Sequence, residues 1–188
     1  MAYELIVIGV SLGGLTAVKK VLEALPKGFP AAVAVVQHRR LDADEMLVNL
    51  LQDLTAMPVV EPEDKDPIRP GYVYLAPSDY HLLVEKGHFA LSTDAPVWHA
   101  RPSIDALFES AADAYRERVV GVILTGNSQD GAQGLAVIKR KGGLTMVQDP
   151  HTAEAAAMPK AAIAATAVDK VLPLEAIGPC LAEVGGTQ

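Results

Sequence analysis

A serine, a histidine and two aspartates each follow one of the most apolar segments of this chain. They are Ser11, His38, Asp130 and Asp149, and the segments before them are residues 5–8, 32–37, 119–125 and 144–148. A serine hydroxyl becomes a strong nucleophile when a base removes its proton. An imidazole serves as that base when a carboxylate fixes its tautomer and stabilises its charged form. These residue types indicate a hydrolase that acts through a serine, with either aspartate as the orienting acid.

The serine lies in a glycine-framed turn, Gly9-Val10-Ser11-Leu12-Gly13-Gly14, between a predicted strand and a predicted helix. The unpaired N–H groups of a helix N-terminus would lie beside the hydroxyl and could bind an anion. Each candidate also has a structural interpretation. Ser11 and Asp130 could be helix caps, His38 a surface histidine and Asp149 a turn residue. Only their meeting on one rim of a sheet favours catalysis.

Strand and helix patterns alternate along most of the chain, which favours a doubly wound α/β fold with a mainly parallel sheet and helices on both faces. Ligands of such sheets bind beyond the carboxyl ends of the strands. We expect one domain over residues 1–188. Strands are predicted near residues 4–9, 32–37, 119–125, 144–148 and 168–172, and helices after residue 14, after a capping pair at Asp42 and Glu45, over 102–118, around 135–138, in an Ala-rich stretch and near 174–183.

The middle of the chain predicts a different arrangement. Residues 72–76, 81–85 and 88–92 are predicted as short strands, the last two joined at Lys86-Gly87 as a hairpin. We expect an antiparallel elaboration at one edge of the sheet. Residues 61–70, which are charged and rich in proline, are expected to form a surface loop.

Composition excludes several functional classes. A net charge of −7 disfavours binding to a nucleic-acid backbone, and no apolar run is long enough to insert into a membrane. One cysteine, Cys180, excludes an internal disulfide and fits a reducing cytoplasm. The histidines show no regular metal-ligand spacing, so we expect no metal and no cofactor. Trp98, before the helix at 102, could close onto the core or form a substrate-facing lip.

The glycine turn also permits a dinucleotide interpretation. Gly9-x-Ser11-x-x-Gly14 is close to the Rossmann fingerprint, but a serine replaces the second glycine. The second strand ends in Gln37-His38 instead of an acidic residue, although Arg39-Arg40 could meet a 2′-phosphate. An NADP-binding protein therefore stays a minor alternative.

Several spaced motifs together resemble the chemotaxis-type protein-glutamate methylesterases, the catalytic domain of CheB. The similarity spans nearly the whole chain and implies a cytoplasmic enzyme that removes methyl groups from glutamyl γ-methyl esters of chemoreceptor helices and can deamidate glutamines. The motifs are Gly9-x-Ser11-x-Gly13-Gly14, Gln37-His38, Gly71-Tyr72-Val73-Tyr74-Leu75-Ala76-Pro77, Arg101-Pro102-Ser103-x-Asp105, Leu124-Thr125-Gly126-x-x-x-Asp130-Gly131, and Gln148-Asp149 followed by Met158-Pro159.

The resemblance implies roles for individual positions. Ser11 would be the nucleophile, His38 the base and Asp130 the orienting acid. The remaining site residues would contribute to the oxyanion site or to substrate binding. They are Leu12, Gly13, Asn127 and Arg101.

The sequence departs from the family pattern in three respects. Leu12 replaces the usual threonine, and Asn127-Ser128 replaces Met-Gly before the acid, which would alter the loop if the glycine needs a positive φ. The chain also begins at the first catalytic strand, without the receiver domain of most family members. The chain would then act alone, be a piece of a longer protein, or have a separate receiver-domain protein or histidine kinase as a partner. A catalytically impaired signalling module of the same fold is the alternative function.

Overall fold

In the computed structural model, residues 3–38 and 44–186 are described, and most of their strands form one parallel sheet. Its strand order is β3-β4-β2-β1-β7-β8-β9, with every neighbouring pair parallel. The doubly wound fold class predicted from the sequence is thus confirmed. The strands are β1 (Leu5–Val10), β2 (Ala32–Gln37), β3 (Val59–Val60), β4 (Val73–Leu75), β7 (Val119–Ile123), β8 (Leu144–Gln148) and β9 (Lys170–Leu172).

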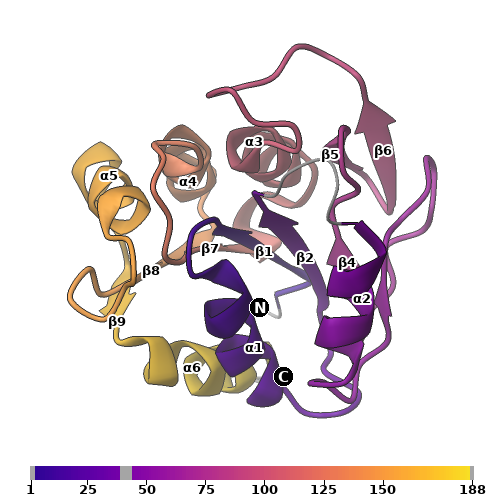
Figure 1. Cartoon of the computed structure of the whole chain (residues 1–188), viewed down its shortest axis with the longest axis horizontal. Helices are drawn as coiled ribbons and strands as arrows, with labels where there is room; N and C mark the ends of the chain where they lie inside the picture. Colours follow the sequence, from indigo (N-terminus) through magenta and orange to yellow (C-terminus); the bar gives the residue numbers. More distant parts are fainter. Residues whose placement is uncertain (1–2, 39–43, 187–188) are drawn as a thin grey trace.

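Helices cover both faces of the sheet (Figure 1), with α3, α4 and α5 on one face and α1 and α6 on the other. The helix α2 packs through Leu51 into the same core as α1. The helices are α1 (Gly14–Glu23), α2 (Asp44–Gln52), α3 (Ile104–Tyr115), α4 (Ala132–Arg140), α5 (Ala157–Ala165) and α6 (Leu174–Gly186), and a 3₁₀ turn, Arg116–Arg118, follows α3.

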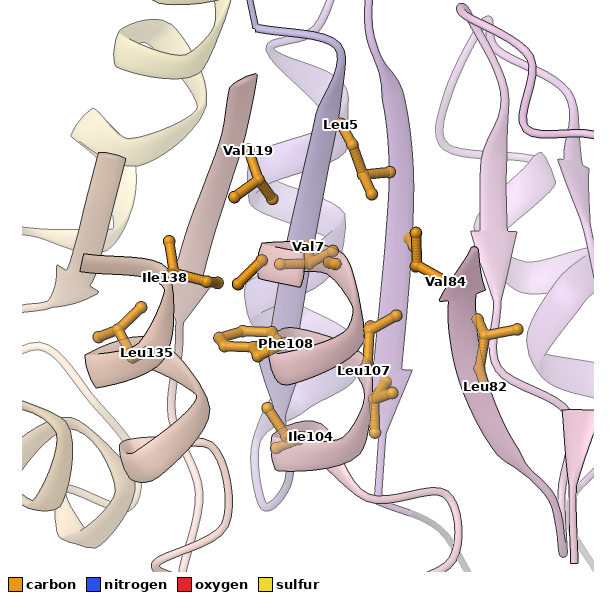
Figure 2. Close-up of a cluster of buried hydrophobic side chains, with 14 of the residues drawn as sticks. Leu5, Val7, Leu82, Val84, Ile104, Leu107, Phe108, Val119, Leu135 and Ile138 are labelled. Atoms are coloured by element: carbon orange, nitrogen blue, oxygen red, sulfur yellow. The ribbon is translucent and has the colours of Figure 1, made fainter. Parts of the chain in front are cut away.

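Alternate residues of the central strand β1 build the two cores. Leu5 and Val7 point toward α3 and α4, whereas Ile6 and Ile8 pack on the opposite face with α1 and α6. Figure 2 shows the first core, to which β1 contributes Val7 and α3 contributes Phe108. All six residues of β1 are buried, as expected for a strand covered on both faces.

The predicted hairpin forms a two-stranded antiparallel sheet of its own, β5 (His81–Glu85) and β6 (His88–Ser92). Leu82 and Val84 of β5 join the same core beside α3 (Figure 2). The hairpin therefore extends the α3 layer instead of pairing with the main sheet.

Grouping residues 72–76 with this hairpin was wrong. They contain β4, which pairs in parallel with β2 inside the main sheet. The strand β3, two residues long, was not predicted. Part of the proposed capping pair before α2, Asp42, lies outside the described residues, as do Arg39 and Arg40. Among the described helices, none has the length and apolarity that crossing a bilayer requires.

Candidate active site

Ser11 occupies a tight turn that joins β1 to α1. Its N–H donates to the carbonyl of Thr125 (3.0 Å), and its carbonyl accepts from the N–H of Gly14 (2.9 Å). Gly13 caps α1 with φ 76°, in the left-handed region that glycine adopts without a steric penalty. The turn therefore holds the serine at the carboxyl end of β1 and at the N-terminus of α1.

Strand pairing places His38 beside this turn. Val10 and Gln37 are paired in the β1–β2 register, and the His38 N–H donates to the Val10 carbonyl (3.0 Å). Ser11 directly follows Val10, the last residue of β1, and His38 directly follows Gln37, the last residue of β2. The side-chain amide of Gln37 connects them further, because its Nε2 donates to the carbonyls of Ser11 and His38, both at 2.9 Å.

His38 is bound to Asp130, with 2.7 Å between its Nε2 and the Oδ2 of the carboxylate. Asp130 is 1% exposed and precedes α4. Its carboxylate also accepts from Ser103 Oγ (2.9 Å) and from the N–H groups of Ile104 (2.7 Å) and Asp105 (2.8 Å). These three donors lie at the N-terminus of α3 and, together with His38, fix the orientation of the carboxylate.

Because Nε2 of His38 is bonded to Asp130, Nδ1 is the ring nitrogen that could take a proton from a hydroxyl. A carboxylate acceptor fixes the neutral ring with its proton on Nε2, so Nδ1 carries a lone pair. Within the described residues, no hydrogen bond joins the Ser11 hydroxyl to this ring. Such bonds are often long before substrate binds.

Ser11 and His38 line one open cleft of about 470 Å³. Its remaining lining comes from the start of α1, the end of β2 and one residue of α2, and is partly apolar. These residues are Leu12, Gly13, Gly14, Leu15, Thr16, Gln37 and Leu47.

The family model described as CheB methylesterase matches residues 6–181 of this chain. The chain belongs to the CheB methylesterase family. Members of this family are carboxylic ester hydrolases, and the α/β fold and the rim of polar residues agree with that assignment.

Individual relatives of the CheB methylesterase family extend this result. A protein from Leptospira interrogans is 50% identical over 94% of this chain and 92% of its own length. The "Protein-glutamate methylesterase/protein-glutamine glutaminase 2" of Anaeromyxobacter dehalogenans is 45% identical over 96% of this chain and 53% of its own length. The crystal structure of the Thermotoga maritima CheB methylesterase catalytic domain superposes with a TM-score of 0.93 at 34% identity and covers 97% of this chain and 99% of that one.

The turn after Ser11 is where the resemblance predicts part of the oxyanion site. Within the described residues, no acceptor is found for the N–H groups of Leu12 and Gly13, whereas the N–H of Gly14 closes the turn. The buried Thr125 fixes this turn, since its Oγ1 donates to the Leu12 carbonyl (2.9 Å) and accepts from the Ala155 N–H (2.9 Å). Thr125 is a residue of the site to which the sequence pattern assigns no role.

Two residues expected to contact the substrate are not among those that line this cleft. Arg101 does not line the cleft. Its guanidinium binds Asp79 (Nε–Oδ1 3.0 Å) and the carbonyls of Thr93 (2.9 Å) and Asp94 (3.2 Å). It therefore anchors the segment before α3. Asn127 is exposed and also outside the residues that line the cleft.

The replacement of glycine by Ser128 does not strain the loop. Among the described non-glycine residues, positive φ angles occur at Lys65, Asp79, Trp98, His99 and Arg116, and Ser128 is not one of them. Its Oγ accepts from the Asp130 N–H (3.1 Å), so it supports the loop before the acid.

The alternative acid, Asp149, is bonded to His151, and within the described residues no hydrogen bond joins it to His38. It accepts from the N–H and the Nδ1 of His151, both at 2.9 Å, as the turn interpretation predicted. Asp130 is not the cap of its own helix, because Gly131 is the N-cap of α4 and the Asp130 side chain serves α3 instead. Across residues 3–38 and 44–186, no cluster of His, Cys, Asp and Glu could hold a metal.

Proposed function

We propose that this protein hydrolyses the γ-methyl esters of glutamyl side chains, with Ser11 as nucleophile, His38 as base and Asp130 as orienting acid. The observation that carries the proposal is the 2.7 Å bond between His38 and Asp130, behind a cleft that His38 and Ser11 share. Two curated relatives, of Anaeromyxobacter dehalogenans and Myxococcus xanthus, are named protein-glutamate methylesterases, which supports this choice of ester.

In the first half of the reaction, Ser11 Oγ attacks the ester carbonyl while its proton passes to Nδ1 of His38. The carbonyl oxygen becomes an oxyanion, which the N–H groups of Leu12 and Gly13 would stabilise together with the N-terminus of α1. Collapse of this intermediate breaks the bond to the methoxy oxygen. That oxygen takes the proton from Nδ1 and leaves as methanol.

In the second half, water attacks the acyl-serine ester and gives its proton to Nδ1. Collapse returns that proton to Ser11 and releases glutamic acid, which gives the other proton of the water to solvent and becomes the carboxylate. Throughout, Asp130 keeps the proton on Nε2 and stabilises the imidazolium that forms twice per cycle. The same steps on a glutamine side chain would release ammonia.

The partner we propose is a methylated cytoplasmic helix of a chemoreceptor. The cleft is open and lined on one side by the exposed side chains of Leu12 and Leu15, which leaves room for an ester carried by a folded protein. Small-molecule esters would then be poor substrates, because they lack the remote binding energy of a protein surface.

Methanol release from a methylated receptor fragment tests the proposal. The intact protein should release methanol, and Ser11→Ala should not, whereas Ser92→Ala on the hairpin should match the intact protein. Equal rates for the intact protein and Ser11→Ala would exclude serine catalysis. A fluorophosphonate that labels the intact protein at Ser11 would also exclude the catalytically impaired signalling module.

A further inference from the structure

The N-termini of α3 and α4 are each capped by the aspartate of the other. Asp130, just before α4, accepts from the N–H groups of Ile104 and Asp105 in the first turn of α3. Asp105 returns this contact, because its Oδ1 accepts from the N–H groups of Gly131 (3.0 Å) and Gly134 (2.6 Å) in the first turn of α4. The catalytic proposal uses Asp130 and leaves Asp105 without a role.

The two helices approach so closely here that the contact has little freedom. A Cβ on Gly134 would lie 2.5 Å from the Cβ of Phe108, and one on Gly131 would lie 2.7 Å from Cγ2 of Ile104. Gly131 also has φ 98°. Only glycine fits both positions, so the N–H groups of this turn are held against the Asp105 carboxylate.

Both carboxylates are withdrawn from water, with 5% of Asp105 and 1% of Asp130 exposed. Burial raises the pKa of the Asp105 carboxyl, and the charge of Asp130 raises it further, whereas the donors on Gly134, Trp98 and Gly131 act against this shift. The third donor is the indole of Trp98, whose Nε1 lies 3.0 Å from Oδ2. The groups that the described structure offers to Asp105 are thus all donors, which suits a carboxylate that accepts only.

We propose that Asp105 is a positioning residue that holds the turn carrying Asp130 in the orientation that meets His38. It acts through the Gly131 and Gly134 N–H groups and does not touch the substrate. This inference rests on the proposed function only for its kinetic consequence, because the geometry of the His38–Asp130 pair is measurable without any reaction.

The charged groups that act on Asp105 lie on α3 and in the turn before α4. Among the described residues, Asp130 before α4 and Glu109, one turn further along α3, interact with it electrostatically, and His38 lies behind Asp130. Removing the charge of Asp105 withdraws one of two buried negative charges that favour the imidazolium. The acid limb of the pH–rate profile should then move to lower pH.

Two substitutions separate the hydrogen bonds of Asp105 from its charge. Asp105→Asn keeps an oxygen for the two glycine N–H groups and loses only the acceptor for the Trp98 indole, whereas Asp105→Ala removes all three bonds. The matched control is Asp113→Ala on the same helix, where the carboxylate is exposed and pairs with Lys141 at 3.0 Å. The first readout is the rate at which a small fluorophosphonate labels Ser11, which does not depend on receptor binding.

We expect Asp105→Ala to label about tenfold more slowly than the intact protein, comparable with the loss of outer-shell support at metal sites. Asp105→Asn should recover to within about threefold at neutral pH, with its acid limb moved to lower pH, and Asp113→Ala should be unchanged. Labelling of Asp105→Ala at the rate of the intact protein would overturn the inference. Should Asp105→Ala not fold, an unmoved acid limb in Asp105→Asn would overturn it.

The second readout is the NMR signal of the His38 Nε2 proton in its bond to Asp130. This proton should be sharp in the intact protein and in Asp105→Asn, and should exchange faster in Asp105→Ala. An unaltered signal in Asp105→Ala would refute the positioning role even if the protein hydrolyses no ester. If the fluorophosphonate does not label Ser11 of the intact protein, but the His38 Nε2 proton still exchanges faster in Asp105→Ala, the result counts against the proposed function alone.

Discussion

Asp130→Asn tests the central geometry, because an amide cannot serve all four donors that the carboxylate serves. The donors are the His38 Nε2, Ser103 Oγ and the N–H groups of Ile104 and Asp105. The amide nitrogen must take the place of Oδ1 or Oδ2. In either orientation it opposes one backbone N–H, which costs about 1–3 kcal/mol of folding free energy.

The two orientations differ in their effect on His38. With nitrogen at the Oδ2 position, the amide donates to Nε2 and moves the ring proton to Nδ1, where it blocks the base. A comparable change of tautomer in the serine-protease triad lowers kcat by about 10⁴, or about 5 kcal/mol of activation free energy. With nitrogen at the Oδ1 position, the tautomer is kept and only the negative charge is lost. That loss is comparable with removal of one oxyanion donor, about 10²-fold.

We therefore expect Asp130→Asn to lower kcat for methanol release by between about 10²- and 10⁴-fold. Its unfolding free energy, measured in urea, should fall by no more than about 3 kcal/mol. Asp113→Asn on the surface of α3 serves as the control for both measurements. An Asp130→Asn protein that keeps kcat within tenfold of the intact protein would refute the role assigned to the carboxylate.

Two further substitutions test the support of the site and of the fold. In Gly14→Ala, the new Cβ would lie 2.1 Å from the Gln37 Oε1, so the amide that bridges the two strands must move. We expect a loss of about 1–3 kcal/mol in urea unfolding with slower fluorophosphonate labelling, and labelling at the normal rate would contradict this. Burial alone would raise the pKa of Asp169, but the Lys139 ammonium and the N–H and hydroxyl of Thr145 outweigh it and hold this pKa below 3.8. A depressed pKa stabilises the fold above pH 3.8 and loses that contribution as the pH falls through the folded-state value. Asp169→Asn should cost about 1–2 kcal/mol at pH 7 and progressively less at acid pH, and a loss independent of pH would refute this.

The parts of the fold that the sequence predicts well are those with a continuous apolar signal. The runs at 5–8, 32–37 and 144–148 became β1, β2 and β8, because strands covered on both faces need apolar residues at every position. Such a signal is weak in β4, which has three residues, and in β3, which has two. Local patterns also cannot show whether a short strand pairs with its sequence neighbour or with a distant strand, and so β4 was grouped with the hairpin.

For the candidate site too, the sequence predicts some features and not others. The residue types of the proposed triad could be read from the ends of three strands, but spacing could not choose between Asp130 and Asp149. The structure separates them through strand order, because β7, which precedes Asp130, adjoins β1, whereas β8, which precedes Asp149, lies one strand further away. No pattern in the sequence shows that Asp105 and Asp130 exchange helix caps, since that contact depends on the distance between two helices.

The pairing of Val10 with Gln37 places the proposed nucleophile and base one position beyond adjacent partners on neighbouring strands. The distance between the main chains of Ser11 and His38 is thus set by the spacing of paired strands, about 4.8 Å. A slip by a single residue would turn His38 toward the opposite layer of helices. Activity therefore depends on an intact central sheet. In rising denaturant, turnover should be lost together with global unfolding and not at a lower denaturant concentration.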